Sequence, residues 1–313
     1  MNEQFLNDVL KGLGAKHKEL YSKYFYDHEG DLLFQKIMQA PEYYLTKCEA
    51  EIFVQRSGEI ASLLVTRMQA FDLLELGAGD ASKSSFLLKA LVEQGAAFTY
   101  MPVDISASMI DYLEWTLPGQ IPGLRIQGLQ GDYFAMLQDV KRMSKLPKLV
   151  LFLGSNIGNF ETGEALEFFS TLNAALNPGD LVLMGFDIKK NPHTIFHAYN
   201  DRAGYTKAFN LNLLTRINKE LNGNFDITAF EHYNSYNPFS GACRSFLVSL
   251  KEQEVRVGSE LFYFLENETI KMEISQKYSL EEIREMGNQT NFDVVETYFD
   301  SKRWFLDILW QVT

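Results

Sequence analysis

The sequence predicts an α/β protein built on a doubly wound, mostly parallel sheet. Three observations support this fold class. Short apolar runs alternate with helical patterns five times between residues 69 and 187, which is the order of parallel strands joined by right-handed crossover helices. The first run ends at a glycine turn, Gly77-Ala78-Gly79, where a strand would pass into a helix. From about Asn191 the alternation stops, which indicates a different module.

The segment before the alternation, residues 2–51, is helical in pattern and rich in Tyr and Phe. Near its end, Thr46 and Glu49 have the spacing of a capping box, in which each side chain bonds to the other's backbone N–H. We therefore expect a long helix from Cys48 to about Thr66.

The alternating region supplies five expected strands, and the first, a short apolar run, reads as buried on both faces. The expected strands are residues 71–76, 97–103, 124–130, 148–153 and 180–186. The expected helices between them are residues 82–94, 106–117, a segment ending at 137, and 164–176.

The second module is expected to be α+β and inserted into the sheet domain. Its predicted helices are residues 193–203 and 207–221, and its extended segments are 243–250, 261–265 and 269–278. Ser279 and Glu282 then form a capping box that opens a short helix. Residues 293–299 and 304–310 would add two antiparallel strands and complete a seven-strand sheet. The domain boundaries we expect are 1–50 and 191–276 for the α+β module, and 51–190 and 277–313 for the sheet domain.

Composition excludes several function classes. The 29 basic and 41 acidic side chains give a formal charge of −12, which argues against nucleic-acid binding because a basic stripe is needed to displace counterions. No apolar run approaches the roughly 18 residues of a membrane span, and residues 1–4 lack the start of a signal peptide. The two cysteines, Cys48 and Cys243, are typical of a reducing compartment. We expect a soluble, cytoplasmic protein without a membrane or nucleic-acid partner.

The strand ends carry groups that suit a nucleoside, which parallel sheets bind beyond their carboxyl ends. Asp104 follows the second strand and could accept both hydroxyls of a ribose. Asp132 and Tyr133 follow the third strand and offer an acceptor and a flat neighbour for adenine. The Gly-x-Gly turn has Ser82 where a dinucleotide fingerprint requires its third glycine. The combination favours S-adenosylmethionine over NAD.

Other polar residues leave two readings open. Asn159, after the fourth strand, could contact a small polar substrate or serve the turn. Glu273 and Ser275, two apart on a strand, could hold an imidazole or an ammonium group, or could form a solvated edge. His193 and His197 share a helix face but lack a third ligand, so we favour a surface pair and expect no metal.

Eight segments recur in one order in a known family. They are Phe25-Tyr26-Asp27; Pro41-Glu42-Tyr43-Tyr44 with Thr46 and Glu49; Glu75-Leu76-Gly77-Ala78-Gly79 with Lys83; Pro102-Val103-Asp104-Ile105-Ser106; Phe152-Leu153-Gly154-Ser155-Asn156-Ile157-Gly158-Asn159; Ala198-Tyr199-Asn200-Asp201; Phe209-Asn210-Leu211-Asn212; and Glu273-Ile274-Ser275-Gln276-Lys277. Over nearly the whole chain the sequence resembles the histidine-specific Nα-methyltransferases of ergothioneine biosynthesis.

The resemblance implies a class I methyltransferase with a Rossmann-like seven-strand sheet, and a substrate-binding module made from residues 1–50 and 191–276. It implies transfer from S-adenosylmethionine to the α-amino group of histidine, up to the trimethylated betaine. We separately expect a monomer. The implied cofactor residues are Gly77, Lys83, Asp104, Asp132 and Tyr133. The implied substrate residues are Tyr43, Gly154, Asn159 and Tyr199, with Asn159 and Tyr199 on the carboxylate, and Glu273 and Ser275 on the imidazole. Tyr26, Tyr43 and Asn159 would act at the reacting amine, and Tyr26 and Phe34 would line the pocket.

Two departures from the family pattern concern the substrate. The family's Gly-Ser-Thr reads Gly154-Ser155-Asn156, and a segment resembling Arg-Ile-Glu-Met reads Arg244-Ser245-Phe246-Leu247. Tryptophan or a thiolated histidine is the alternative substrate within the class, and a non-catalytic amino-acid or nucleoside sensor is the alternative outside it. No strong base stands out, so water or a Tyr hydroxyl would relay the amine proton.

Overall fold

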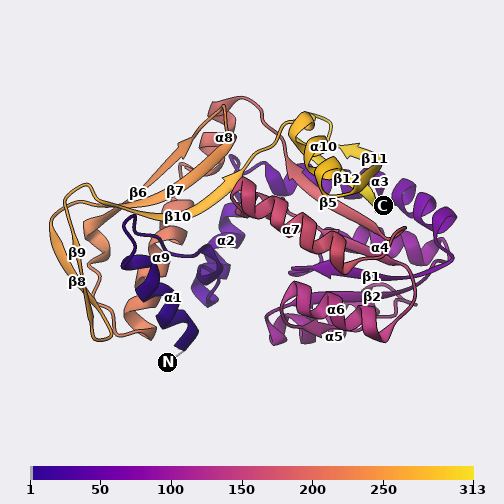
Figure 1. The fold of residues 1–313 in the computed structure, drawn as a ribbon, viewed down its shortest axis with the longest axis horizontal. Coiled ribbons are helices and arrows are strands. Elements are labelled where there is room, and N and C mark those ends of the chain that lie inside the picture. The colour runs from indigo at the N-terminus through magenta and orange to yellow at the C-terminus, as the bar shows by residue number, and fades with distance from the viewer. Residues whose placement is uncertain (1–2) are drawn as a thin grey trace. The chain divides into compact units, whose positions relative to one another are not determined.

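The computed structural model describes residues 3–313. Residues 1 and 2, which belong to the N-terminal segment that we judged unlike a signal peptide, lie outside it. The chain forms two compact units, each from two separate segments (Figure 1). Unit 1 comprises the described part of Met1–Tyr44 together with Lys189–Lys277, and unit 2 comprises Leu45–Ile188 and Tyr278–Thr313. Within residues 3–313, every helix is too short or too polar to cross a membrane.

Unit 2 contains the seven-strand sheet. Its strands are β1 (Ala70–Leu76), β2 (Ala97–Asp104), β3 (Leu129–Gln130), β4 (Lys148–Phe152), β5 (Leu181–Asp187), β11 (Phe292–Phe299) and β12 (Phe305–Val312). Their order is β11-β12-β5-β4-β1-β2-β3. The first five pair in parallel, whereas β12 pairs antiparallel with both β5 and β11. The predicted mixed sheet is confirmed.

The third strand is much shorter than the predicted residues 124–130. Only Leu129 and Gln130 belong to β3, and a single further bridge joins Ile126 to Tyr100. The ladder is interrupted at Gly128, whose N–H donates to the Glu114 side chain at 2.6 Å and not to β2.

The helices of unit 2 are α3 (Leu45–Arg67), α4 (Ser84–Glu93), α5 (Ala107–Gln120), α6 (Tyr133–Met143), α7 (Thr162–Ala175) and α10 (Leu280–Gln289), with a short 3₁₀ turn, η2 (Asn156–Asn159). The capping box of Ser279 and Glu282 at α10 is confirmed. The capping box expected from Thr46 and Glu49 is wrong, because α3 begins at Leu45 and the Glu49 carboxylate bonds to other elements.

Unit 1 has its own sheets and core. Its helices are α1 (Glu3–Leu13), η1 (Ser22–Tyr24), α2 (His28–Gln39), α8 (Pro192–Ala198), α9 (Tyr205–Glu220) and η3 (Ile227–Ala229). Its strands are β6 (Phe230–Tyr236), β7 (Ala242–Ser249) and β10 (Thr269–Gln276) in the order β10-β7-β6, with a separate pair, β8 (Gln253–Val257) and β9 (Glu260–Phe264). Neither β6 nor β8 was predicted, because polar and charged residues weaken their apolar alternation. Helices α1, α2 and α9 contribute apolar side chains to a single core cluster with these strands.

The core of unit 2 is centred on aromatic rings. The fully buried Trp310 of β12 lies 5.1 Å from the ring of Phe169, 5.7 Å from Phe186 and 5.8 Å from Phe292. These rings come from a helix and three strands, so Trp310 holds the antiparallel end of the sheet to α7.

We expect Trp310→Ala to destabilise unit 2 by about 3–5 kcal/mol, since it removes a large buried ring and leaves a cavity. The matched control is Trp115→Ala, because Trp115 is 83% exposed and its loss should change the unfolding free energy by less than about 0.5 kcal/mol. Urea unfolding followed by circular dichroism measures both. Similar midpoints for the two variants would contradict the assignment of Trp310 to the core.

Candidate active site

The turn after β1 allows the backbone to approach a ligand closely. Gly77 and Gly79 have φ of 71° and 53°, in the left-handed region that favours glycine. A Cβ on Gly77 would lie 2.6 Å from the hydroxyl oxygen of Tyr133, at the start of α6. The structure therefore brings two predicted cofactor residues into direct proximity, and only glycine fits at residue 77.

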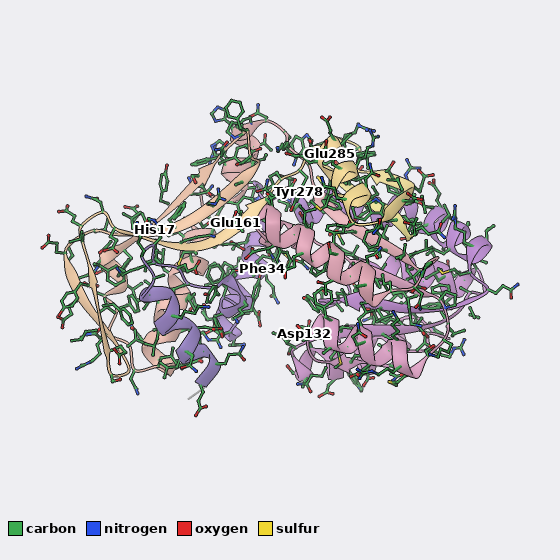
Figure 2. All side chains as sticks on the ribbon, in the orientation of Figure 1. His17, Phe34, Asp132, Glu161, Tyr278 and Glu285 are labelled. Carbon is green, nitrogen blue, oxygen red and sulfur yellow. The ribbon has the colours of Figure 1, made fainter. Side chains whose placement is uncertain are left out.

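The two predicted carboxylates lie at adjacent strand ends of unit 2. Asp104 ends β2, and its Oδ1 accepts from the Ser106 N–H at 2.9 Å. Asp132 caps α6, where its Oδ1 accepts from the N–H groups of Phe134 and Ala135 (Figure 2). Burial, with the charges of Asp104 and Asp132, raises the pKa of Tyr133 to about 12. The three side chains thus share one edge of the sheet.

Glu49, which we expected to form a capping box, instead contacts both Lys83 and Gly154. The Glu49 carboxylate of α3, 1% exposed, forms an ion pair with the Lys83 ammonium and accepts from the Gly154 N–H at 2.6 Å. The available signal was a charged residue on the apolar face of α3, between Cys48 and Ile52.

Two more buried carboxyls lie near this ion pair. The pKa of Asp307 is raised well above its ordinary value by burial and by Glu49, against the opposing effect of Lys83. Burial raises the pKa of Glu75 to about 7, although Tyr100 donates to that carboxyl at 2.6 Å. Burial alone would lower the pKa of Lys83, but Glu49 outweighs it and the net shift is upward. One lysine therefore lies near three carboxyls, and burial shifts the pKa of Asp307 and of Glu75 upward.

The loop after β4 places its two asparagines differently. The Asn159 side chain is exposed, at the end of η2. The Asn156 amide instead approaches both glycine turns, since Cβ atoms built on Gly77 and Gly154 would lie 3.7 Å and 3.6 Å from it. Asn156 is thus a site residue that we did not predict; its signal was a polar side chain between two glycines.

In unit 1 a hydrogen-bonded cluster joins two predicted substrate residues. The hydroxyl oxygens of Tyr199, at the end of α8, and Ser275, on β10, lie 2.6 Å apart. The fully buried Lys277 ammonium donates to both, at 2.6 Å to Tyr199 and 2.8 Å to Ser275. We did not assign Lys277 a role, because a lysine after a strand ordinarily indicates solvent.

Aromatic rings extend from this cluster through the predicted pocket residues. The Tyr43 ring lies 6.1 Å from that of Tyr199, the ring of Phe34 on α2 lies 6.4 Å from that of Tyr43, and the ring of Tyr26 lies 5.6 Å from that of Phe34. Burial, followed by the effect of Tyr199, raises the pKa of Tyr43 well above its ordinary value. The Tyr43 hydroxyl therefore stays protonated near neutral pH, whereas Tyr26 is 45% exposed.

Glu273 has no hydrogen bond or ion pair from its carboxylate to any described side chain. On β10 it lies opposite Ser245 of β7, and Ser275 lies opposite Cys243, so Glu273 and Ser275 share one sheet face. Burial raises the pKa of the Glu273 carboxyl to about 7, with Lys277 opposing that shift. A carboxylate without a protein partner beside an ordered hydroxyl is suited to bind a polar ring.

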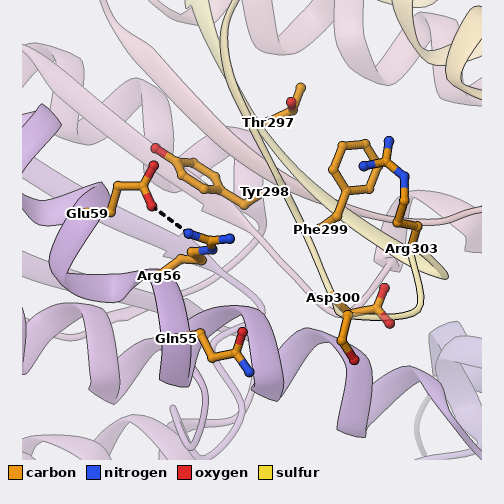
Figure 3. A pocket seen from close by; sticks show the side chains of 9 residues that line it. Gln55, Arg56, Glu59, Thr297, Tyr298, Phe299, Asp300 and Arg303 are labelled. Carbon is orange, nitrogen blue, oxygen red and sulfur yellow. Dashed lines mark hydrogen bonds and ion pairs between the residues drawn. The ribbon is translucent and has the colours of Figure 1, made fainter.

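Two further features, a histidine pair and a surface hollow, are not among the predicted cofactor or substrate residues. His193 and His197 are exposed on α8, with ring centroids 6.4 Å apart, and residues 3–313 contain no group of three His, Cys, Asp or Glu arranged to hold a metal. A hollow of about 300 Å³ lies between α3 and the turn that joins β11 to β12 (Figure 3). In this hollow Arg56 pairs with Glu59 at 3.1 Å, and Arg303 covers the Phe299 ring.

The sheet order and the glycine turn define unit 2 as a class I methyltransferase domain, as predicted. A family model described as histidine-specific methyltransferase, SAM-dependent, matches residues 5–312, and the chain belongs to this family. The predicted resemblance is therefore confirmed, and the protein is an S-adenosylmethionine-dependent N-methyltransferase.

Three relatives represent the range of similarity. A histidine N-alpha-methyltransferase from Mycobacterium tuberculosis is 37% identical over 80% of this chain and 77% of its own. Ergothioneine biosynthesis protein 1 from Schizosaccharomyces pombe is 28% identical over 90% of this chain but only 37% of its own. A 4-dimethylallyltryptophan N-methyltransferase from Claviceps fusiformis is 30% identical over 69% of this chain and 62% of its own.

We expect Glu49→Ala to destabilise unit 2 by about 2–4 kcal/mol, because it leaves the Lys83 ammonium and the Gly154 N–H without their buried partner. Adding Lys83→Met to that variant should restore part of the loss, because the ammonium group that had lost its partner is then removed as well. Glu59→Ala, on the exposed face of α3, is the matched control and should cost less than about 0.5 kcal/mol. The measurement is a double-mutant cycle in urea, and strictly additive losses would show that the pair is not coupled.

Proposed function

We propose that this enzyme methylates the α-amino nitrogen of L-histidine, up to the trimethylated betaine. The observation that carries the proposal is the Glu273 carboxylate, which has no hydrogen-bond or ion-pair partner among the described side chains and shares a sheet face with Ser275. Histidine is the amino acid whose side chain offers two ring nitrogens to such a pair. The family and the mycobacterial relative support the same substrate.

The residues of unit 2 fit S-adenosylmethionine, which supplies an electrophilic methyl group. The space beside Gly79 is open, which allows close backbone approach, and the Tyr133 hydroxyl lies beside Gly77. We assign the ribose to Asp104, the adenine amine to Asp132, and the cofactor's carboxylate to Lys83. Each aspartate uses Oδ1 to order its own turn, which holds the carboxylate in a defined orientation.

We assign the substrate's carboxylate to Asn159 and Tyr199, its imidazole to Glu273 and Ser275, and further contacts to Gly154 and Tyr43. Alignment of the amine supplies much of the acceleration that such a transfer needs. The amine must first lose its proton. Tyr43 would relay that proton by accepting it from the amine while its own hydroxyl proton passes to water, because its hydroxyl stays protonated. The rings of Tyr26 and Phe34 would stabilise the methylated ammonium by about 0.5–2 kcal/mol through cation–π contact.

We further propose that the enzyme acts as a cytoplasmic monomer. The chain has only two cysteines, Cys48 and Cys243, and both are buried, which suits a reducing compartment. Light scattering in solution should give a mass near 35.9 kDa; twice that mass would contradict the monomer.

The test of substrate is incubation of the purified protein with S-adenosylmethionine and each protein amino acid in turn, read by mass spectrometry. We expect histidine alone to gain the mass of three CH₂ groups. A gain on tryptophan would keep the methyltransferase class and overturn the substrate. Binding of histidine without any gain in mass would instead support a sensor.

Two substitutions should separate the two binding sites. We expect Glu273→Ala to weaken histidine binding about tenfold or more, since an N–H of the ring loses its charged acceptor, with cofactor affinity little changed. Asp104→Ala should weaken cofactor binding by a similar factor and leave histidine binding little changed. Isothermal titration calorimetry with S-adenosylhomocysteine and with histidine measures all four affinities. Equal losses of both ligands in either variant would contradict the assignment.

A further inference from the structure

The buried Lys277 ammonium imposes a direction on the hydrogen bonds around it. An ammonium group has three donors and no lone pair, so it donates in both of its contacts with hydroxyl oxygens. Those contacts are 2.6 Å to Tyr199 and 2.8 Å to Ser275. Each hydroxyl oxygen therefore uses one lone pair to accept from Lys277.

The contact between the two hydroxyls then determines what Ser275 can offer. The Tyr199 and Ser275 oxygens are 2.6 Å apart, so one must donate to the other. A phenol is a stronger acid than an aliphatic alcohol and the better donor, which favours donation from Tyr199 to Ser275. Ser275 then accepts from both Lys277 and Tyr199. Both of its lone pairs are occupied, and only its O–H is left for a ligand.

The same sheet face presents the opposite chemistry at Glu273. An ionised carboxylate only accepts hydrogen bonds, and no described side chain bonds to this one. Ser275 and Glu273 therefore present one donor and one acceptor to a ligand. A neutral imidazole has the matching set, a bare nitrogen and an N–H, whereas an imidazolium has two N–H groups and would place one of them against the Ser275 donor.

We propose that Lys277 is a positioning residue that forces Ser275 to donate, so that the site accepts the substrate's imidazole only in its neutral form, with N–H on Glu273 and the bare nitrogen on Ser275. This inference rests on the proposed assignment of Glu273 and Ser275 to the ring. Lys277 itself need not touch the substrate.

The charges around Glu273 bear on the pH dependence of this site. Lys277 directly follows the strand that carries Glu273, and Cys243 faces Ser275 from β7. Tyr199 comes from the end of α8, and Tyr43 and Tyr26 come from the N-terminal segment. Burial raises the pKa of Glu273 to about 7 and Lys277 opposes that shift, so the carboxylate becomes fully ionised only above neutral pH.

The test is the affinity for imidazolepropionate, which has the histidine ring without the α-amine, measured by calorimetry against pH. A complex of neutral ring and ionised Glu273 contains neither proton. With pKa values of about 6.5 for the ring and about 7 for Glu273, its affinity rises about two- to threefold from pH ~7 to pH ~8.5. It falls about thirtyfold from pH ~7.5 to pH ~6. If the complex instead retains one proton, on the ring or on Glu273, the affinity for imidazolepropionate falls about tenfold from pH ~7 to pH ~8.5. That result would overturn the proposal.

The variant Lys277→Met leaves Ser275 able to accept. Because Ser275 keeps its O–H and regains a free lone pair, we expect the variant to bind the neutral ring at pH ~8.5 within about threefold of the wild type. It should lose much less affinity than the wild type between pH ~7.5 and pH ~6, because the protonated ring is now tolerated. Lys251→Met, at an exposed lysine of unit 1, is the matched control and should follow the wild-type profile. A purely structural role for Lys277 would weaken binding equally at every pH, and that result would also overturn the proposal.

The remaining outcomes are separable. If Lys277→Met does not fold, Ser275→Ala tests the same donor and should lose at least about tenfold at pH ~8.5; unchanged affinity there would contradict the inference. If the wild-type protein binds S-adenosylhomocysteine but neither histidine nor imidazolepropionate at any pH, the proposed substrate fails and this inference fails with it. If it binds and methylates histidine but shows the one-proton profile, only this inference fails.

Discussion

A charge that leaves water must be paired or hydrogen-bonded, and this constraint organises both halves of the molecule. In unit 2 the Lys83 ammonium pairs with Glu49, which also holds the Gly154 backbone. In unit 1 the Lys277 ammonium donates to Tyr199 and Ser275. In each case a lysine, half-buried at Lys83 and fully buried at Lys277, contacts side chains from elements that are far apart in sequence. The positions of the predicted binding residues therefore depend on charge pairing as much as on the apolar core.

The two lysines differ in how their charge is balanced. Lys83 faces three carboxyls, and burial with the charge of Glu49 raises the pKa of one of them, Asp307. Lys277 contacts two neutral hydroxyls, and the charged group whose pKa it affects, Glu273, forms no direct bond with it. The first arrangement fixes Lys83 and the Gly154 backbone at the edge of the sheet. The second leaves a carboxylate for a ligand, which suits a specificity pocket.

Much of the fold could be predicted because its signals are local. Continuous apolar runs marked β1, β4 and β5, and Ser279 with Glu282 marked the start of α10. The third strand could not be predicted at its true length, because Gly128 turns its N–H to a side chain fourteen residues away in sequence. Strands β6 and β8 carry too many polar residues for an apolar alternation to show.

The site could be predicted in part, and the residues that were missed share one property. Glu49, Asn156 and Lys277 act through partners that are distant in sequence. Glu49 even fits a local motif, a capping box, which the tertiary ion pair overrides. The glycine turn and the strand-end carboxylates were found because their positions follow from sheet topology alone.

We infer that Glu273 and Ser275 of unit 1 bind the imidazole ring of histidine. Nitrogen NMR of ring-labelled ¹⁵N-histidine is the direct test of this binding. When labelled histidine is bound to the protein together with S-adenosylhomocysteine, we expect two distinct ring signals. One comes from an N–H nitrogen and the other from a bare nitrogen that accepts a hydrogen bond. Substitution of Glu273 or Ser275 should each shift one signal and not the other. Two protonated nitrogens, or shifts identical to those of free histidine, would contradict it.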